Sequence, residues 1–176
     1  MDIRDREKLV EAFEHMVESV HKSIHDAEEA LAPTVDEMVH NAEELARELY
    51  ALTQEEAHSL GETLRRDLHK ANRVLNQQGK EVREWLSFDL ALAGDRFIDL
   101  IARAADKTWL DFRAFEAGTG LREEYRAGEV CSAGSLRCVA CGEVQTLERA
   151  SQIETCAACG HGIFRRVSAD DAEPGS

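Results

Sequence analysis

The sequence predicts a mainly α-helical fold: an antiparallel hairpin or bundle of long helices, with a small metal-held β-sheet at its C-terminal end. Three observations lead to this prediction. Apolar residues recur at steps of three and four through most of residues 1–117, which is the period of an amphipathic helix. The two prolines are Pro33 and Pro174, so the long stretch between them lacks the strongest helix breaker. Two Cys-x-x-Cys-Gly units follow, at 138–142 and 156–160.

The first predicted helix runs from about residue 4 to residue 31. Its apolar face comprises Leu9, Phe13, Met16, Val20, Ile24, Ala27 and Leu31. Pro33 ends or kinks this helix. Thr34, with Glu37 three residues later, then forms a capping box that starts a second helix. The second helix carries an unbroken heptad seam, which is typical of a coiled-coil contact. The seam residues are Val35, Met38, Ala42, Leu45, Leu49 and Leu52.

A second capping box, Thr53 with Glu56, predicts that a third helix starts near residue 54 and continues towards residue 87. Its seam comprises Ala57, Leu60, Leu64, Leu68, Ala71, Leu75, Gln78, Val82 and Trp85. A turn around Gly94 leads to a fourth predicted helix. The apolar side of that helix comprises Phe97, Ile98, Ile101, Ala105, Trp109 and Phe112. We assign residues 1–117 to this helical region and residues 118–129 to a polar linker.

The four paired cysteines predict a tetrahedral metal site with a structural zinc ion. Their thiolates are a complete ligand set for structural zinc, and the glycine after each pair suits a turn that needs a positive φ. The predicted ligands are Cys138, Cys141, Cys156 and Cys159. The β-prone segments 144–147, 151–153 and 163–167 complete a zinc ribbon over residues 130–167. A module this small needs the metal in order to fold. The acidic tail, 168–176, is predicted to be disordered.

Other interpretations of the cysteines stay open at this point. The same spacing fits iron in a rubredoxin-like site, and two disulfides are the remaining alternative. Cys131 lies outside the pattern and is predicted to be a free, partly buried thiol. His161 directly follows the second pair and could replace a cysteine ligand, but four thiolates already complete the shell.

Charge and composition narrow the classes of function. The net charge is −14, and residues 1–50 contribute 14 acidic against 5 basic side chains. This acidic half repels phosphate backbones, so non-specific nucleic-acid binding through it is not expected. Its charges indicate a solvated helical surface or a docking surface for a basic partner. Neither a secretory signal nor an apolar stretch of about 20 residues is visible, so we expect a cytoplasmic protein without a membrane segment.

One pattern raises the possibility of an enzyme. Glu-x-x-His occurs at Glu18/His21, Glu37/His40 and Glu55/His58, and di-iron bundles use such pairs. A di-iron bundle followed by two Cys-x-x-Cys-Gly units resembles the layout of rubrerythrins. The helical phase opposes this interpretation, because all three pairs fall beside the predicted seams. His21 and His25, four residues apart, are a further candidate for weak transition-metal binding.

Several runs resemble a family of small, uncharacterised bacterial proteins that contain a zinc ribbon after a long helical N-terminal part. The runs are 52–56, 66–68, 128–130, 134–142 and 156–166. The resemblance implies a cytosolic bacterial protein with metal ligands at the four paired cysteines, and it implies no activity.

We therefore expect a non-enzymatic zinc-binding protein that acts as an interaction or regulatory module for a protein or macromolecular complex. A rubrerythrin-like redox protein and a zinc-ribbon regulator that binds nucleic acid or RNA polymerase are the alternatives. A homodimer is also compatible with long amphipathic helices.

Overall fold

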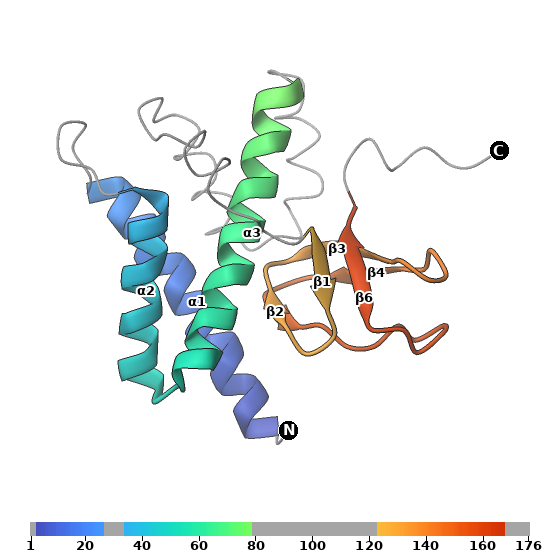
Figure 1. Ribbon diagram of the computed structural model, residues 1–176, viewed down its shortest axis with the longest axis horizontal. Coiled ribbons are helices and arrows are strands. Elements are labelled where there is room, and N and C mark those ends of the chain that lie inside the picture. The colour runs from blue at the N-terminus through green and yellow to red at the C-terminus, as the bar shows by residue number, and fades with distance from the viewer. Residues whose placement is uncertain (1–2, 27–33, 79–122, 168–176) are drawn as a thin grey trace.

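The computed structural model describes residues 3–26, 34–78 and 123–167. Three helices pack together, and a small β-domain lies against one side of them (Figure 1). The helices are α1 (Ile3–Asp26), α2 (Val35–Tyr50) and α3 (Gln54–Gln78). The predicted fourth helix, the turn at Gly94, the ends of the first and third predicted helices and the tail lie outside the described residues. No helix in the described ranges has an apolar stretch long enough to cross a bilayer.

Both predicted capping boxes are present, and they set where α2 and α3 begin. The Thr34 hydroxyl accepts from the Glu37 N–H at 3.2 Å, and the Glu37 carboxylate accepts from the Thr34 N–H at 2.8 Å. Thr53 and Glu56 repeat this arrangement, with 2.8 Å between the Thr53 nitrogen and the Glu56 carboxylate. Between the two helices, Ala51 adopts a left-handed conformation with φ of 49°. The short connection makes α2 and α3 antiparallel neighbours.

The helical core confirms the predicted faces of the first and third helices and corrects that of the second. Residues of the predicted α1 and α3 seams are buried at Leu9, Phe13, Met16, Val20, Ile24, Ala57, Leu60, Leu64 and Leu68. On α2, however, the side chains of Leu45 and Leu49 are 39% and 60% exposed, while Val39 and Ala46 are buried. A straight α-helix drifts away from a strict seven-residue repeat, and α2 packs between two helices. Its buried face therefore follows the period of 3.6, and neither a long-helix hairpin nor a coiled-coil seam is confirmed.

The C-terminal domain consists of two small antiparallel sheets. The larger has the strand order β1-β6-β3-β4, and the smaller pairs β2 with β5. The strands are β1 (Glu124–Arg126), β2 (Val130–Cys131), β3 (Gly134–Cys138), β4 (Val144–Leu147), β5 (Ser151–Gln152) and β6 (Ile163–Arg166). Strand β1 lies inside the range predicted as a linker, 118–129, because its backbone completes the edge of β6. The predicted return strand at 151–153 pairs with β2 and not with β4.

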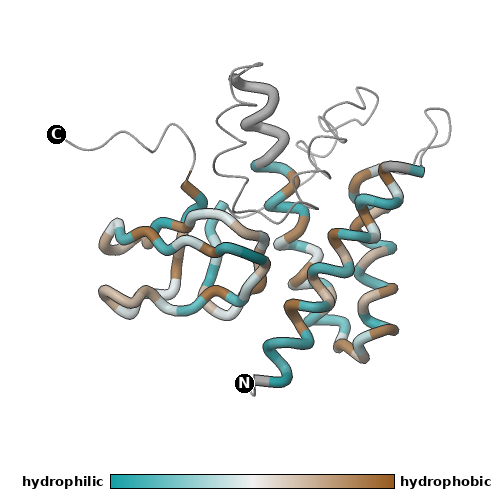
Figure 2. Tube along the Cα trace, turned by 180° about the vertical axis from the view of Figure 1, so that it is seen from behind, coloured by the Kyte–Doolittle hydropathy of each residue, from teal (hydrophilic) through white to brown (hydrophobic). Residues whose placement is uncertain are grey.

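The ribbon packs against α1 and α3 through β2 and β5. Val130 of β2 is 2% exposed and belongs to the same apolar core as the helices. Seen from behind, the two knuckle loops of the ribbon extend to the side away from the helices (Figure 2). The ribbon is thus fixed at one end, and its two cysteine-containing turns lie at the other.

Candidate metal centre

Each Cys-x-x-Cys-Gly unit forms a tight turn closed by its own backbone. In the first, the Cys138 N–H donates to the Glu143 carbonyl at 2.8 Å, and the Gly142 N–H donates to the Cys138 carbonyl at 3.0 Å. Gly142 has φ of 77°, a conformation that side chains disfavour. The second turn repeats these features with Cys156, Gly160 and His161, at 2.8 and 2.7 Å and with φ of 73° at the glycine. The predicted role of both glycines is confirmed.

The two turns bring the four predicted ligands together. All four Sγ atoms lie within 4.8 Å of one another. The Cys138–Cys159 and Cys141–Cys156 sulfur pairs are 3.7 and 3.5 Å apart. Zinc–thiolate bonds of about 2.3 Å in a tetrahedron place sulfurs about 3.8 Å from each other. The donor set and its spacing therefore fit a tetrahedral metal ion.

The neighbouring thiols of this cluster shift one another's pKa values. Burial raises the pKa of Cys138, but the N–H groups of Cys141 and Ala140 and the neighbouring thiols outweigh it and lower that pKa to about 7. The Glu143 N–H lowers the pKa of Cys141, yet the adjacent thiols of Cys159, Cys156 and Cys138 raise it to about 12. The Cys138 thiol thus ionises more readily than the Cys141 thiol. A bound metal ion would deprotonate all four thiols, because its cysteine ligands bind as thiolates.

The comparisons with known proteins agree with this geometry. The sequence matches the model of a family described as a zinc-ribbon containing domain over residues 22–168. The chain belongs to this zinc-ribbon containing family. Comparisons with curated proteins and with solved structures found no match. The matched range includes α2, α3 and the whole ribbon, whereas most of α1 precedes it.

Cys131 and His161, the other cysteine and the histidine that lie near the ligands in the sequence, both lie outside the cysteine cluster of this zinc-ribbon containing protein. Cys131 is fully buried in the ribbon core with Tyr125 and Phe164, and burial raises the pKa of its thiol to about 12. His161 is partly exposed, and its carbonyl accepts from the Cys156 N–H, so it shapes the second turn through its backbone. Neither residue belongs to the four-sulfur cluster.

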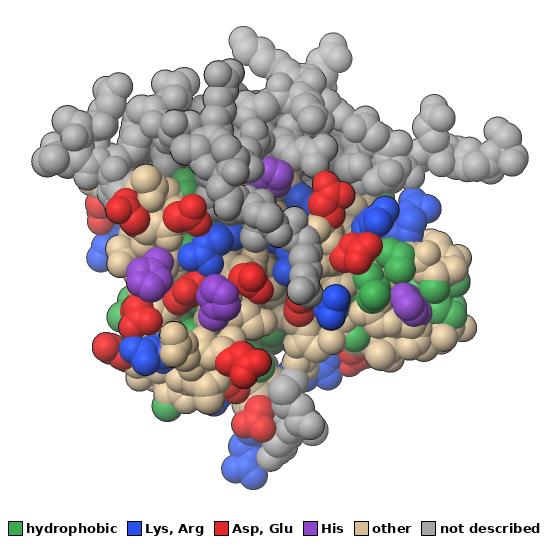
Figure 3. Space-filling view, viewed as in Figure 1, with side chains coloured by type: hydrophobic (Ala, Val, Ile, Leu, Met, Phe, Trp, Pro, Cys, Tyr) green, Lys and Arg blue, Asp and Glu red, His purple; other side chains and the backbone are tan. Residues whose placement is uncertain are grey.

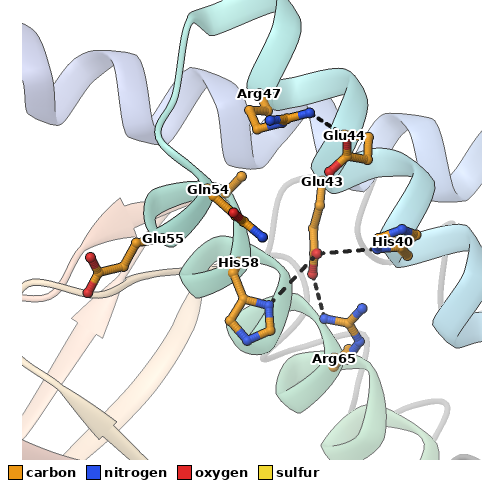
Figure 4. Close-up of a pocket in the computed structure, with 9 residues that line it drawn as sticks. His40, Glu43, Glu44, Arg47, Gln54, Glu55, His58 and Arg65 are labelled. Carbon is orange, nitrogen blue, oxygen red and sulfur yellow. Dashed lines mark hydrogen bonds and ion pairs between the residues drawn. The ribbon is translucent and has the colours of Figure 1, made fainter.

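Among the described residues, no ion pair joins Glu37 to His40 or Glu55 to His58. Glu37 is used in the capping box of α2. Glu55 lines the same groove as His40 and His58, but its side chain points away from Glu43 (Figure 4). These two histidines approach Glu43 instead, a residue outside the pattern. Among the described residues, the four cysteines are the one group of three or more potential ligands whose donor atoms all lie within 4.8 Å.

No sequence pattern predicts the anchor that joins the ribbon to α3. Asp67, whose side chain is 1% exposed, accepts from Arg166 Nη2 at 2.9 Å. It also accepts from the Tyr125 hydroxyl at 2.7 Å and from the Ser132 N–H and hydroxyl at 2.9 and 2.6 Å. Gly134, with φ of 133°, leaves the space that the Arg166 guanidinium occupies. We call Asp67, Tyr125, Ser132 and Arg166 the anchor network.

The charges of the anchor network reinforce one another. Burial alone would lower the pKa of Arg166, but Asp67 raises it, so the guanidinium stays charged. Burial and the Asp67 charge raise the pKa of Tyr125, so its hydroxyl remains a donor. Beside this network, Arg66 Nη1 donates to the Glu129 carboxylate at 2.9 Å and to the Glu124 carbonyl at 2.8 Å. The helices therefore hold the base of the ribbon by both charge and hydrogen bonds.

Proposed function

We propose that this protein is a non-enzymatic zinc-binding protein whose ribbon tip recognises another protein, with the helices as its scaffold. The observation that carries the proposal is the closed set of four thiols at the end of the ribbon that points away from the helices. Catalytic zinc sites keep one position open for water or substrate, whereas structural sites are filled by protein ligands. Four thiolates leave no such position, so the ion would serve to hold the shape of the tip.

Zinc is the ion we expect, because it needs no redox chemistry and suits a tetrahedron of thiolates. Elemental analysis of the full chain, purified under reducing conditions, should find about one zinc per chain. Stoichiometric iron with visible absorbance would instead favour the rubrerythrin-like alternative. The free thiols and the metal spacing of the cysteines also favour a reducing compartment such as the cytoplasm.

The tip offers apolar surface. Val139 lies within the first Cys-x-x-Cys-Gly turn and Val144 follows it, and these residues are 44% and 42% exposed. The space-filling view shows hydrophobic side chains grouped on the ribbon, while acidic side chains spread over the helical face (Figure 3). Apolar groups on a rigid surface supply the core of a protein interface, so this tip suits a protein partner.

The charges of the ribbon give less support to a nucleic-acid partner. Arg166 is held in the anchor network, and Arg165 pairs with Glu124 at 3.0 Å. Two of the four arginines of the ribbon therefore have carboxylate partners within the protein, although nucleic-acid binding depends on cations available to phosphates. A gel shift at low and at raised salt tests this alternative, and clear retardation that weakens with salt would favour it.

Affinity purification from the native cell with matched variants tests the proposed tip. The double variant Val139→Asp/Val144→Asp should lose the co-purifying protein while keeping its zinc. The control, Leu45→Asp/Leu49→Asp, places the same charges on the exposed leucines of α2 and should retain the partner. If the tip variant keeps the partner and the α2 variant loses it, the recognition surface is helical and the proposal is wrong.

A further inference from the structure

A groove between α2 and α3 contains a second cluster of potential metal ligands, far along the sequence from the cysteines. Its volume is about 620 Å³, and its lining includes His40, Glu43, His58 and Arg65 (Figure 4). His40 and Glu43 lie three residues apart on α2, and His58 comes from the first turns of α3. The short, capped turn between α2 and α3 thus brings two imidazoles and a carboxylate to the same groove.

Glu43 is seated in the helix interface by a glycine. The residue is only 7% exposed, and a Cβ atom at Gly61 of α3 would overlap its carboxylate. Glycine inside a helix costs about 1 kcal/mol relative to alanine. Burying a carboxylate is a further cost unless it is paired. The sequence therefore accepts the cost of the glycine in order to place this carboxylate here, and Arg65 offsets the cost of its burial.

The two carboxylate oxygens of Glu43 have different surroundings. Oε1 accepts from Arg65, which also pairs with Asp36 at 3.0 Å. Oε2 faces His40 Nδ1 at 3.8 Å and His58 Nδ1 at 3.9 Å. Both distances are too long for a hydrogen bond. Oε2 therefore faces two imidazole nitrogens across a space that none of the three atoms fills.

We propose that His40 Nδ1, Glu43 Oε2 and His58 Nδ1 bind one divalent first-row transition-metal ion in this groove, with water completing its shell. Two imidazoles and a carboxylate select such ions over Ca²⁺ or Mg²⁺. Metal–ligand bonds of about 2.0–2.2 Å require the imidazoles to move closer to Oε2 and to each other. Both side chains are free to do so, since they are 66% and 62% exposed.

A fourth residue supports the assignment. Glu62 Oε1 lies 3.9 Å from Nε2 of His58, the ring nitrogen that does not face Glu43, and a small movement of the ring would bring the two atoms within hydrogen-bond distance. Metal-bound histidines usually give their second ring nitrogen to a carboxylate, which fixes the ring and raises its basicity. The ion pair with Arg65 offsets part of the negative charge of Glu43. We therefore expect the groove to bind its ion more weakly than four thiolates would. This site does not depend on the function proposed for the ribbon.

The test uses the full chain with its cysteine site already saturated with Zn²⁺. Calorimetric titration with Ni²⁺ should detect about one further ion per chain. His40→Ala, His58→Ala and the isosteric Glu43→Gln should each weaken binding at least tenfold, and Glu62→Gln should weaken it several-fold. Glu44→Gln removes a charge from the same groove without touching a ligand and should change affinity less than twofold. With Co²⁺ in place of Ni²⁺, d–d bands should appear without thiolate charge-transfer bands.

Three outcomes would overturn the site. One is the absence of any Ni²⁺ binding beyond the ribbon. Another is equal weakening in Glu44→Gln and Glu43→Gln, which would indicate only a diffuse acidic surface. The third is binding that survives His40→Ala/His58→Ala and disappears in His21→Ala/His25→Ala, which would move the ion to α1. The exposure of His40 and His58 keeps their alanine variants folded, and helical circular dichroism confirms this for each protein.

Discussion

Replacing Asp67 with asparagine should separate the ribbon from the helices more effectively than any exposed substitution. The side chain keeps its shape but loses its charge and one of its two acceptor oxygens. Tyr125, Ser132 and Arg166 together donate four hydrogen bonds to the two oxygens of Asp67. In the asparagine variant, only one side-chain oxygen remains to accept them. Arg166, whose side chain is 16% exposed, is left without its counter-ion.

The size of the loss follows from the burial of the pair. Removing one partner of a buried ion pair costs about 3–5 kcal/mol, because the remaining charge stays buried without compensation. We therefore expect the free energy of unfolding of the zinc-loaded chain to fall by about 3 kcal/mol or more. Arg166→Met should also be costly, and the double variant should lose less than the sum of the two single losses.

Urea unfolding of the zinc-loaded full chain measures this effect with two probes. Circular dichroism follows the helices, and a metal-sensitive dye follows zinc release from the ribbon. The matched control is Arg165→Met, the neighbouring arginine, which is 62% exposed and pairs with an exposed glutamate; it should change stability by less than about 0.5 kcal/mol. A loss below about 1 kcal/mol for Asp67→Asn, or equal losses for the two arginine variants, would refute the anchor network.

Three further predictions concern the helices and the buried thiol. The N–H groups of the N-cap threonines lower the pKa of Glu37 and Glu56 from 4.5. The ionised Glu37 and Glu56 carboxylates therefore stabilise the folded helices above pH 4.5, and this stabilisation is lost as the pH falls through the lowered folded pKa. In Glu37→Gln and Glu56→Gln variants, the helical circular dichroism signal should depend less on pH in this acid range. Gly61→Ala should destabilise the wild type by about 1–3 kcal/mol, yet stabilise a Glu43→Ala background by up to about 1 kcal/mol, as measured by urea unfolding. Cys131, with its pKa near 12, should resist iodoacetamide in the native protein and react after denaturation, as mass spectrometry can follow.

The parts of the fold that were predictable from sequence depend on neighbours close along the chain. A capping box joins residues three apart, as Thr34 and Glu37 do. Each knuckle spans a few residues, so the spacing of the cysteines was sufficient to identify the cluster. The apolar faces of α1 and α3 followed the same local logic, since each helix buries one continuous stripe.

The parts that were missed depend on contacts between distant segments. Asp67 and Arg166 are separated by 99 positions, and each alone resembles an ordinary surface charge. Glu43 lies on the flank of the predicted α2 seam, and only the glycine on the facing helix makes room for its burial. Strand β1 lies in a polar stretch whose strand character comes from its pairing with β6. Such features are decided by packing, so one-dimensional patterns do not contain them.

The path of β6 explains why the metal centre and the helices are parts of one structure. The strand begins soon after the second knuckle, and Phe164 pairs in register with Cys138, the last residue of β3. Two residues later, Arg166 reaches Asp67 on α3. A single strand therefore connects the four sulfurs, the ribbon core and the anchor network. If the ribbon depends on its metal to fold, as we expect for a module of this size, loss of the ion would withdraw Arg166 and leave the Asp67 carboxylate without its counter-ion at the helix surface. We therefore expect removal of the metal to lower the stability of the helices as well as that of the ribbon.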